Sequence, residues 1–410
     1  MKLPLAGIRV LDLSQGWAGP TTTYLLGDLG AEIVKVESIQ RVDWWRIMGQ
    51  NPEDPKFWER RGAWNNVNRN KYDVTLDLTT PEGAALIRDM VRISDVFVEN
   101  FSVRVMRRFG LTYPELTKLN PSIIALSMPA FGSTGPWQEY LGFGTNVEQT
   151  SGLSWQTSYE DGYPLGSGVG LADPIAGYNG VLAVLLAVYH RRRTGRGQFI
   201  DLSHIEASGR LIGEKLVDAS INHKVRPQWG NDHPSQTPHG VYRCQGEDAW
   251  VVIAVGTQEE WEALCRVLGM PELASDPRFS DPLGRRKHRE ELDRCIEEWT
   301  SRRDKREVME QMQKAGVPCG AVSSPKDLVE DPHIQARDFM VSLERKEVGT
   351  FKTFGVHVHL SKTPGTIRRP PPSLGEHNEF ILGELLGVPS EEQQRMEAAQ
   401  ITGHQPLGLL

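Results

Sequence analysis

Cysteine is scarce in this sequence of 410 residues, and the four that occur are widely separated. They are Cys244, Cys265, Cys295 and Cys319. No Cys-x-x-Cys pair is present, so the spacing argues against a zinc site and against a disulfide framework. We therefore expect a protein that needs no metal and that works in a reducing compartment, the cytoplasm.

Long hydrophobic runs and an excess of basic charge are also missing. The longest apolar run, Val181 to Tyr189, is too short to span a bilayer, and Met1 to Gly7 lacks the features of a secretion signal. The formal net charge is -7, and basic runs such as Arg191 to Arg193 are short. We expect a soluble intracellular protein with neither a membrane nor a nucleic acid as partner.

The common phosphate-binding and hydrolase motifs are absent as well. The sequence contains no P-loop, no His-Glu-x-x-His and no Gly-x-Ser-x-Gly. The loop from Ser14 to Pro20 has only Gly16 and Gly19, and Trp17 crowds the place where a pyrophosphate would approach. Because a dinucleotide fingerprint needs Gly-x-Gly-x-x-Gly, this loop argues against an NAD-dependent oxidoreductase.

Strand and helix patterns alternate over the first half of the chain. Ile8 to Leu13 and Glu32 to Glu37 are apolar, strand-like runs, and the helical run Thr21 to Leu29 lies between them. This β-α-β unit predicts an α/β fold with a Rossmann-like parallel sheet. Further strands are expected at Asp73 to Leu78, Asp95 to Glu99, Ile123 to Ser127 and Gln198 to Ser203, and helices at Pro174 to Arg193, at His204 to Lys224 and from near Pro81 and Pro114.

The length favours two domains, because a single core stops growing at about 250–300 residues. A stretch rich in Pro, Gly, Asn and His, Arg226 to Pro238, marks a boundary. Beyond it, strands at Gly240 to Cys244 and Ala249 to Ala254 and helices at Gln258 to Leu268, Arg289 to Thr300 and Asp304 to Ala315 predict a smaller α+β domain.

The tail of the chain has too few apolar residues to form a hydrophobic core of its own. It contains an alternating run that resembles an edge strand, Val356 to Leu360, a proline-dense connection and a last helix, Glu376 to Leu386. We expect residues 1–225 and 331–410 to form the large α/β domain together, with residues 226–330 as the inserted smaller domain.

One carboxylate, Asp173, stands between a glycine-rich approach and the start of a helix. An Asp before a Pro is a favoured N-cap, and Pro174 suits the first helical position. The segment therefore predicts a loop that delivers Asp173 to a helix N-terminus. On these residues alone, a capping role and a functional role both remain open.

Nine blocks in fixed order carry a family resemblance. They are Leu5 to Leu13, Ala18 to Pro20, Leu29 to Glu37, Val98 to Phe101, Phe131 to Pro136, Asp173 with Pro174, Arg193 to Gln198 with Ile200 and Asp201, Gly316 to Pro318, and Leu374 to His377. Together they resemble the class III CoA-transferases, the family of carnitine and formyl-CoA transferases. The similar region extends from Leu5 to Gly387.

The resemblance implies that Asp173 is a nucleophile. Its carboxylate would attack an acyl-CoA thioester to give a mixed anhydride, and CoA would then attack back to give an aspartyl-CoA thioester. CoA enters as a co-substrate, and no metal is implied. Succinyl-CoA is the expected donor, a hydrophobic or aromatic carboxylate the expected acceptor, and an interlocked homodimer the expected assembly.

Two alternatives share the same fold. The α-methylacyl-CoA racemases resemble the transferases but pair the aspartate with a histidine, and here Phe143 stands in that segment. Because a phenyl ring carries no proton, the two-base chemistry of a racemase is disfavoured. The second alternative is a non-catalytic CoA-binding subunit of a hetero-oligomer, and the presence of Asp173 speaks against it.

The resemblance also places residues around CoA. Asn100 and Phe101 are expected near the adenine, and Arg108 near the phosphates, with Arg104 as its neighbour on the same short helix. A solvated helix face is the alternative for both arginines.

Two departures from the family pattern concern CoA and the acceptor. Ser38 replaces an arginine that commonly follows the second strand, and Arg41 or Arg46 is expected to substitute for it. Trp17 stands where the oxalate-using branch has glutamine, so oxyanion stabilisation is expected from backbone N–H groups near Gly16 and Trp17.

Five tryptophans in the first part of the chain bear on the size of the acyl group. They are Trp17, Trp44, Trp45, Trp58 and Trp64. Together they suggest a wide apolar pocket for a larger acyl group, and core or dimer contacts are the alternative reading.

Overall fold

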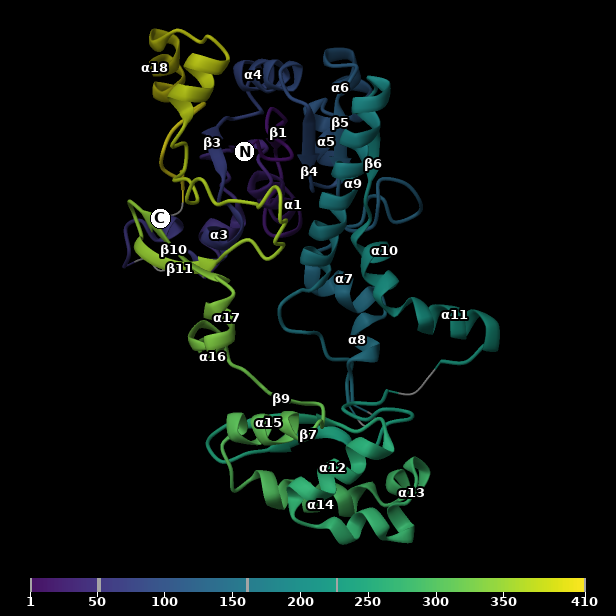
Figure 1. Ribbon diagram of the computed structural model, residues 1–410. Coiled ribbons are helices and arrows are strands. Elements are labelled where there is room, and N and C mark those ends of the chain that lie inside the picture. Colours follow the sequence, from purple (N-terminus) through teal and green to yellow (C-terminus); the bar gives the residue numbers. More distant parts are fainter. Residues whose placement is uncertain (1, 50–52, 160–161, 226–227, 409–410) are drawn as a thin grey trace. The chain divides into compact units, whose positions relative to one another are not determined.

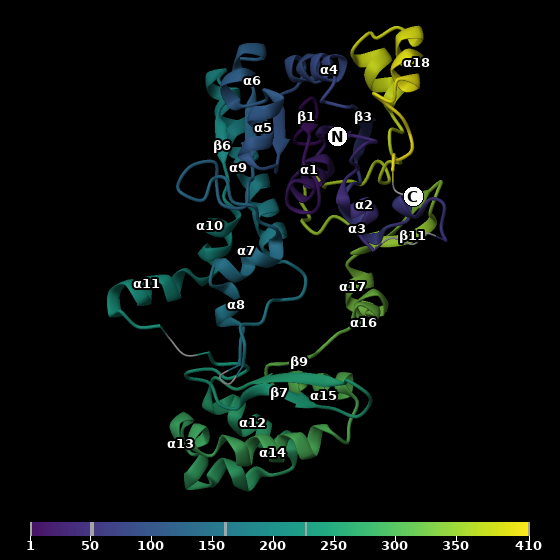
Figure 2. The same cartoon turned by 180° about the vertical axis from the view of Figure 1, so that it is seen from behind.

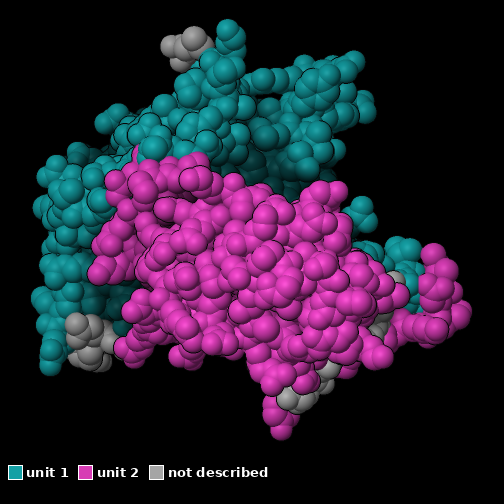
Figure 3. All heavy atoms as spheres, turned by 60° about the horizontal axis from the view of Figure 1, so that its bottom comes forward, with its two compact units in different colours: residues 1–154, 166–220, 336–410 teal, residues 155–165, 221–335 magenta. Residues whose placement is uncertain are grey.

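The computed structural model describes residues 2–49, 53–159, 162–225 and 228–408. The chain divides into two compact units, shown in Figure 3. Unit 1 consists of Met1–Ser154, Gly166–Ser220 and Ala336–Leu410, and unit 2 of Trp155–Leu165 and Ile221–Gln335. The chain enters and leaves unit 2 from unit 1, so the smaller unit is an insertion.

The observed unit boundaries lie at 220/221 and 335/336, whereas the sequence suggested 225/226 and 330/331. Arg226, where the expected boundary begins, lies outside the described residues. The segment Trp155–Leu165 was expected in the large domain and belongs to unit 2. The physical reason is local hydrogen bonding, since Gly230 N–H donates to the Ser158 carbonyl at 3.1 Å and the Asn231 amide to the Tyr159 hydroxyl at 3.3 Å.

A six-stranded parallel sheet forms the centre of unit 1, as the sequence predicts (Figure 1). The strand order is β3-β2-β1-β4-β5-β6. Strands β1 and β4 are neighbours in the middle, β2 and β3 extend the sheet toward one edge, and β5 and β6 extend it toward the other. The strands are β1 (Arg9–Asp12), β2 (Glu32–Glu37), β3 (Lys71–Thr75), β4 (Val96–Glu99), β5 (Ile124–Ser127) and β6 (Phe199–Asp201). Val10 pairs with Ile33 of β2 on one side and Val96 of β4 on the other.

Helices cover both faces of this sheet. The helices that follow the strands along the chain are α1 (Ala18–Asp28), α2 (Trp44–Ile47), α3 (Gly62–Val67), α4 (Pro81–Arg92), α5 (Val103–Phe109), α6 (Tyr113–Leu119), α7 (Gly144–Thr150), α8 (Leu153–Gln156), α9 (Ala172–Thr194), α10 (His204–Gly209) and α11 (Gly213–Asn222). Helices α1 and α9 pack on one face and α4, α5 and α6 on the other. The expected helix from His204 to Lys224 is broken into α10, a 3-10 turn at Arg210–Ile212 and α11.

Alternation along the strands separates two cores. Val10 belongs to the core that packs against α1 and α9, and Leu11 to the core that packs against α4, α5 and α6. Strand residues alternate between faces because successive side chains point to opposite sides of a sheet. The parallel sheet is thus covered on both faces, as parallel sheets generally are.

The C-terminal return segment completes unit 1. It contains the hairpin β10 (Met340–Arg345) and β11 (Gly349–Phe354), a π-helical stretch at Glu379–Leu385 and α18 (Ser390–Ala398). Figures 1 and 2 both show α18 beside α4, and Arg395 lies 3.3 Å from Glu82 at the start of α4. The expected edge strand Val356 to Leu360 is wrong, because that segment has no strand pairing and follows the hairpin instead.

Unit 2 is built around a small antiparallel sheet of order β7-β8-β9. Its strands are β7 (His239–Arg243), β8 (Trp250–Ala254) and β9 (Cys319–Ala321). The main helices are α12 (Gln258–Leu268), α13 (Pro282–Lys287), α14 (Arg289–Thr300) and α15 (Lys305–Lys314), followed by the short α16 (Pro325–Glu330) and α17 (Pro332–Ala336). Trp261 and Phe279 are fully buried in its core.

Helix α9 has 23 residues and is, in the described part of the chain, the one helix long and apolar enough to cross a bilayer by length and composition. The apolar run noted in the sequence is too short for this, but the helix extends beyond the run at both ends. Ala176, Val184 and Val188 of α9 are buried against the sheet and α1, which is the packing of a core helix.

Candidate active site

Asp173 lies in the first turn of α9, with its side chain 16% exposed. The predicted N-cap position is wrong, because the helix begins at Ala172 and Leu171 takes the cap position. Gly168 and Gly170 have φ of +77° and +72°, and these left-handed turns let the chain enter the helix earlier than Pro174 suggests. Asp173 is therefore held by the helix backbone, and the amino end of a long helix favours its negative charge.

Glu148 on α7 holds the loop that leads into α9. It is buried and accepts hydrogen bonds from the Ser167 hydroxyl at 2.8 Å, the Ser167 N–H at 2.5 Å and the Leu171 N–H at 3.0 Å. These bonds fix the loop at both of its ends. The sequence analysis missed Glu148, because its hydrogen-bond partners Ser167 and Leu171 lie in a segment that is distant from it in sequence.

Gly144, the first residue of α7, faces the Asp173 carboxylate. A Cβ atom placed on Gly144 would lie 2.7 Å from Oδ2 and 2.9 Å from Cγ of Asp173. Any side chain at this position would therefore force the carboxylate or the Gly170 carbonyl to move. The sequence analysis had singled out the neighbouring Phe143 but not Gly144.

His204, the first residue of α10, lies against the other carboxylate oxygen. Its Nδ1 is 3.4 Å from Oδ1 of Asp173, and its side chain is 6% exposed. The Nε2 atom is buried and has no hydrogen-bond partner among the described residues. The sequence analysis treated the histidines as scattered and missed this one. The available signal was its position directly after β6, at the carboxyl edge of a parallel sheet where sites are found.

The first loop is held by buried polar side chains. Gly16 has φ of +72°, and its N–H donates to the Asp43 carboxylate at 3.0 Å and 3.2 Å. Lys35 lies 3.3 Å from Asp43 and donates to the Ser14 carbonyl at 2.6 Å. The Gly16 N–H is thus already occupied, so it is not free for the predicted oxyanion role in this structure.

An aromatic wall of four residues, Trp17, Trp44, Trp45 and Phe143, lies between the first loop and α7. The ring centroids are 5.3 Å apart for Trp17 and Trp45, 5.7 Å for Trp44 and Trp45, and 5.9 Å for Trp44 and Phe143. Phe143 directly precedes Gly144, the residue that faces the Asp173 carboxylate. Trp17 contributes its ring here, while its backbone forms the N-cap of α1.

Asn100 and Phe101 follow β4 at the same edge of the sheet. The Asn100 side chain accepts from the Gln15 N–H and donates to the Gln15 carbonyl, both at 2.8 Å. Its amide is therefore committed to bracing the first loop, which differs from the expected contact with adenine. Phe101 is partly buried and packs against the core below α4 and α5.

Arg46 is not available to CoA phosphates, and this prediction is wrong. The side chain is fully buried and pairs with Glu37 at 2.9 Å and Glu59 at 3.0 Å. Its guanidinium carbon lies 3.4 Å from the Trp64 ring centroid. The acidic neighbours raise the pKa of Arg46 further above its ordinary value, against the opposing effect of burial. Trp64 is likewise a core residue, as the alternative reading of the tryptophans allowed.

The remaining predicted arginines are exposed. Arg104 and Arg108 lie on α5, directly after Asn100 and Phe101, and Arg41 lies on the loop before α2. Their exposure is compatible with binding a phosphate and equally with a solvated surface. Within the described ranges, no three His, Cys, Asp or Glu side chains gather in a way that would hold a metal ion.

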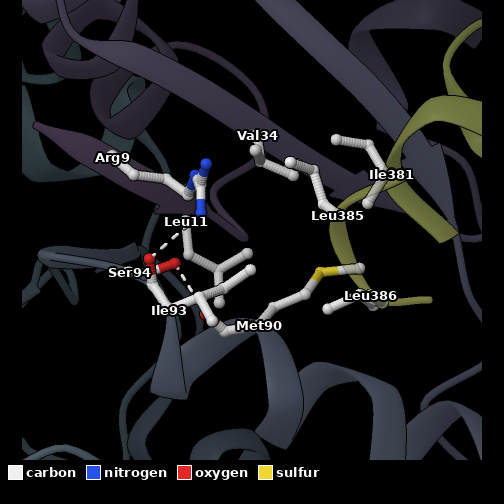
Figure 4. A pocket seen from close by; sticks show the side chains of 9 residues that line it. All are labelled: Arg9, Leu11, Val34, Met90, Ile93, Ser94, Ile381, Leu385 and Leu386. Carbon is white, nitrogen blue, oxygen red and sulfur yellow. Dashed lines mark hydrogen bonds between the residues drawn. The ribbon is translucent and has the colours of Figure 1, made fainter. Parts of the chain in front are cut away.

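Figure 4 shows a small cavity away from these residues. Its volume is about 10 Å³, and its lining includes Arg9 and Leu11 of β1, Met90 and Ser94 at the end of α4, and Leu385 of the return segment. None of the predicted site residues lines it. A space of this size under the C-terminal return segment is a packing gap and not a substrate site.

Comparison with known proteins identifies the family of this chain. The model of CoA-transferase family III matches residues 5–378. Succinyl-CoA–D-citramalate CoA-transferase of Chloroflexus aurantiacus is 33% identical, with 97% of this chain and 98% of that protein covered. Succinate–glutarate CoA-transferase of Agrobacterium fabrum is also 33% identical, with 94% and 96% covered.

A solved structure shows the same fold. The crystal structure of a CAIB/BAIF family protein from Brucella suis superposes with a TM-score of 0.84 and 30% identity, covering 94% of this chain and 100% of that one. The chain belongs to CoA-transferase family III. It is a CoA-transferase, an enzyme that uses CoA thioesters as co-substrates.

Proposed function

We propose that this enzyme transfers CoA between carboxylic acids through a covalent intermediate on Asp173, with succinyl-CoA as donor and a larger hydrophobic or aromatic carboxylate as acceptor. The observation that carries the proposal is the placement of Asp173. Its carboxylate lies in the first turn of α9, nearly buried, between Gly144 and His204. A carboxylate held in this way meets a thioester with little competing water.

The proposed transfer is a series of acyl transfers between carboxylates and the CoA thiolate, and no step requires a proton to be added or removed. Asp173 attacks the thioester carbonyl, the carbon–sulfur bond breaks, and CoA leaves as the thiolate. The thiolate then attacks Cγ of Asp173 in the mixed anhydride and releases the donor acid. The acceptor carboxylate repeats both steps in reverse and leaves as its CoA thioester.

The donor is proposed from the relatives. Both enzymes compared above carry succinyl-CoA or succinate in their names. Their acceptors, D-citramalate and glutarate, are small diacids, whereas this chain has an aromatic wall whose Phe143 directly precedes Gly144, the residue that faces Asp173. The indole and phenyl faces of this wall favour an apolar acyl group over a second carboxylate.

CoA binding is proposed on α5. Arg104 and Arg108 are exposed and follow β4 at the edge of the sheet that bears the first loop. Guanidinium groups suit the phosphates of CoA, and a positive cluster at this position is consistent with the anionic nucleotide end. Arg41, also exposed, is the remaining candidate for this role, since Arg46 is buried.

The racemase alternative is disfavoured by geometry. A two-base racemase needs its bases on opposite sides of the substrate carbon. Phe143 carries no proton, and His204 lies only 3.4 Å from Asp173. At this separation no carbon atom fits between the two groups, so they do not form the two sides of a racemase site.

We further propose a homodimer, with a second copy of the chain covering the outer faces of α9 and α11. Tyr178, Leu182, Leu186 and Tyr189 of α9 are 48–60% exposed and follow one another at helical spacing. Helix α11 buries none of its residues although it carries Leu216, Val217 and Ile221. Exposed apolar faces of this extent are typical of interfaces.

The assembly is tested by the mass of the protein in solution. We expect the wild-type protein to sediment as a dimer and the double variant Leu182→Glu, Leu186→Glu as a monomer. Leu283→Glu, on the exposed surface of unit 2, serves as the control and should stay dimeric. A monomeric wild type would contradict the proposal.

We also propose a cytoplasmic location. The four cysteines are all free thiols, as is usual for proteins of a reducing compartment.

The acceptor is tested with a panel of carboxylates and succinyl-CoA. We expect aromatic and branched aliphatic acids to be converted with higher kcat/KM than glutarate or citramalate. Asp173→Asn, which keeps the shape of the side chain, should abolish transfer to every acid. Preference for the diacids would overturn the acceptor proposal, and transfer by Asp173→Asn would overturn the mechanism.

A further inference from the structure

We propose that His204 is a catalytic residue and that its Nδ1–H stabilises the oxyanion formed on Asp173 itself when CoA attacks the aspartyl carbonyl carbon. The inference rests on the proposed function, since it requires Asp173 to be acylated. It assigns a source of oxyanion stabilisation outside the first loop, where the Gly16 N–H is bound to Asp43.

The two carboxylate oxygens of Asp173 have different surroundings. Oδ1 lies 3.4 Å from His204 Nδ1. Oδ2 faces Gly144, where a Cβ would come within 2.7 Å of it. The Gly144 backbone therefore packs against Oδ2 with no side chain between them, while Oδ1 faces an imidazole that can donate a hydrogen bond. This asymmetry assigns the attack on the thioester to Oδ2 and leaves Oδ1 as the carbonyl oxygen of the anhydride.

The imidazole is set up as a donor toward Oδ1. His204 is buried, and its Nε2 has no hydrogen-bond partner in the described part of the chain. The carboxylate of Asp173 is the acceptor that lies near its other ring nitrogen. A carboxylate accepts and does not donate, so the ring places its proton on Nδ1, and Nδ1 is a donor in the neutral and the cationic ring alike.

The electron movements place negative charge on Oδ1 in the second step. The CoA thiolate adds to Cγ of the anhydride, and the carbonyl electron pair moves to Oδ1. The pair then returns, the bond from Cγ to Oδ2 breaks, and the donor acid departs with Oδ2. In the reverse half, the acceptor carboxylate adds to Cγ, Oδ1 again bears the charge, and the thiolate departs.

The observed separation suits this role. A distance of 3.4 Å is long for a hydrogen bond, and catalytic hydrogen bonds are often long before the substrate binds and shorten as charge develops. Removal of one donor to an oxyanion lowers a rate by about 10²–10³-fold. The first attack, in which charge develops on the substrate's oxygen and not on Oδ1, does not depend on His204 in the same way.

The test separates the two steps in the full-length enzyme mixed with succinyl-CoA and no acceptor. Rapid quenching followed by mass spectrometry measures free CoA and the aspartyl-CoA thioester on Asp173. We expect the wild type to form the thioester with little free CoA. His204→Leu should release CoA in the first step and form the thioester about 10²–10³-fold more slowly.

Two further variants guard against a purely structural effect. Asn places its amide N–H near the position of Nδ1, whereas Gln places it near Nε2. We expect His204→Asn to restore thioester formation to within about tenfold of the wild type, and His204→Gln to leave it slow. A fall of both steps by the same factor in His204→Leu, or equal behaviour of the Asn and Gln variants, would overturn the proposal. A wild-type enzyme that carries neither anhydride nor thioester on Asp173 would instead overturn the proposed function.

Discussion

At the residue scale, Gly144 controls the space around the nucleophile. Gly144→Ala would bring a methyl group within 2.7 Å of Oδ2 of Asp173 and 2.8 Å of the Gly170 carbonyl. We expect kcat/KM to fall about 10²-fold, since a displacement of about 1 Å has an effect of this size. The steady-state assay is accompanied by circular dichroism to show that the fold is kept.

Gly62→Ala is the matched control for Gly144→Ala. Gly62 also begins a short helix, α3, and a Cβ there would meet no atom within 4 Å. Its activity should equal that of the wild type. Full activity of Gly144→Ala would show that the position of the carboxylate does not depend on a glycine beside Oδ2.

Glu99, at the end of β4, provides a test of buried charge. Burial raises its pKa to about 7, and the nearby Asp201 adds to this, while hydrogen bonds from Ser127 and the Phe101 N–H act in the opposite direction. Because the pKa in the folded protein exceeds the ordinary 4.5, the folded state binds the proton more tightly than the unfolded state. The contribution of Glu99 to the free energy of unfolding is fully present below pH 4.5 and is lost as the pH rises through about 7.

Glu99→Gln removes this dependence on pH. We expect the variant to be more stable than the wild type at pH 8 by roughly 2–3 kcal/mol, and the difference to shrink toward pH 4.5. Urea unfolding at the two pH values measures it. A difference that stays constant with pH would contradict the assignment of a raised pKa to Glu99.

The sequence predicted some of these residues and could not predict others. Asp173 was found because it stands in a recognisable block, and its place at a helix start follows from local preferences. Arg46 was misassigned because its partners Glu59 and Asp73 are separated from it in sequence and meet it only in the folded protein. His204 was missed for the same reason, since its contact with Asp173 joins α10 to α9.

At the element scale, the packing of α1 against α9 holds the nucleophile. Gly177 of α9 lies so close to α1 that a Cβ would come within 2.7 Å of the Thr21 side chain and 2.9 Å of the Ala18 carbonyl. Thr22 donates from its hydroxyl to the Gly177 carbonyl at 2.8 Å. The position of Asp173, one turn earlier on α9, depends on this close approach.

Gly177→Val should separate the two helices. We expect a loss of about 1–3 kcal/mol in the free energy of unfolding, the usual effect of overpacking a buried contact, together with lower kcat. Denaturant unfolding measures the first quantity. Gly62→Ala, where the added methyl group meets no atom within 4 Å, should change neither. An unaltered stability of Gly177→Val would show that α1 and α9 are not tightly packed.

Local signals explain which elements were predicted well. Helix α12 was predicted with both ends correct, because Thr257 and Glu260 form a capping box and Gly269 ends the helix in a left-handed conformation. The run Val356 to Leu360 alternates like a strand but finds no partner, since β10 and β11 pair with each other. An alternating sequence forms a strand only where a neighbouring strand is available to pair with it.

At the scale of the whole molecule, a buried ionic cluster joins the two ends of the chain within unit 1. Arg345 of β10 pairs with Glu59, and Glu59 pairs in turn with Arg46, which contacts Glu37 of β2. The Glu59 carboxylate also accepts from the Leu374 N–H at 3.0 Å. The return segment is thus attached to the sheet by charges as well as by its apolar side chains.

Arg46→Met would leave Glu37, Glu59 and Asp73 without their shared cation. We expect a destabilisation of about 3–5 kcal/mol, as for other buried ion pairs that lose one partner. Thermal unfolding measures it, and Arg266→Met, at an exposed position on α12, is the control. At a temperature where the variant is folded, its KM for succinyl-CoA should match that of the wild type. A raised KM would indicate that Arg46 binds CoA after all.

The central claim is that Asp173 becomes covalently attached during transfer. The most direct measurement is incubation of the enzyme with succinyl-CoA, reduction with borohydride and mass spectrometry of the digested protein. The account predicts conversion of Asp173, and of no other carboxylate, to homoserine, and no conversion in Asp173→Asn. Reduction at a different residue, or unmodified protein despite rapid CoA transfer, would contradict it.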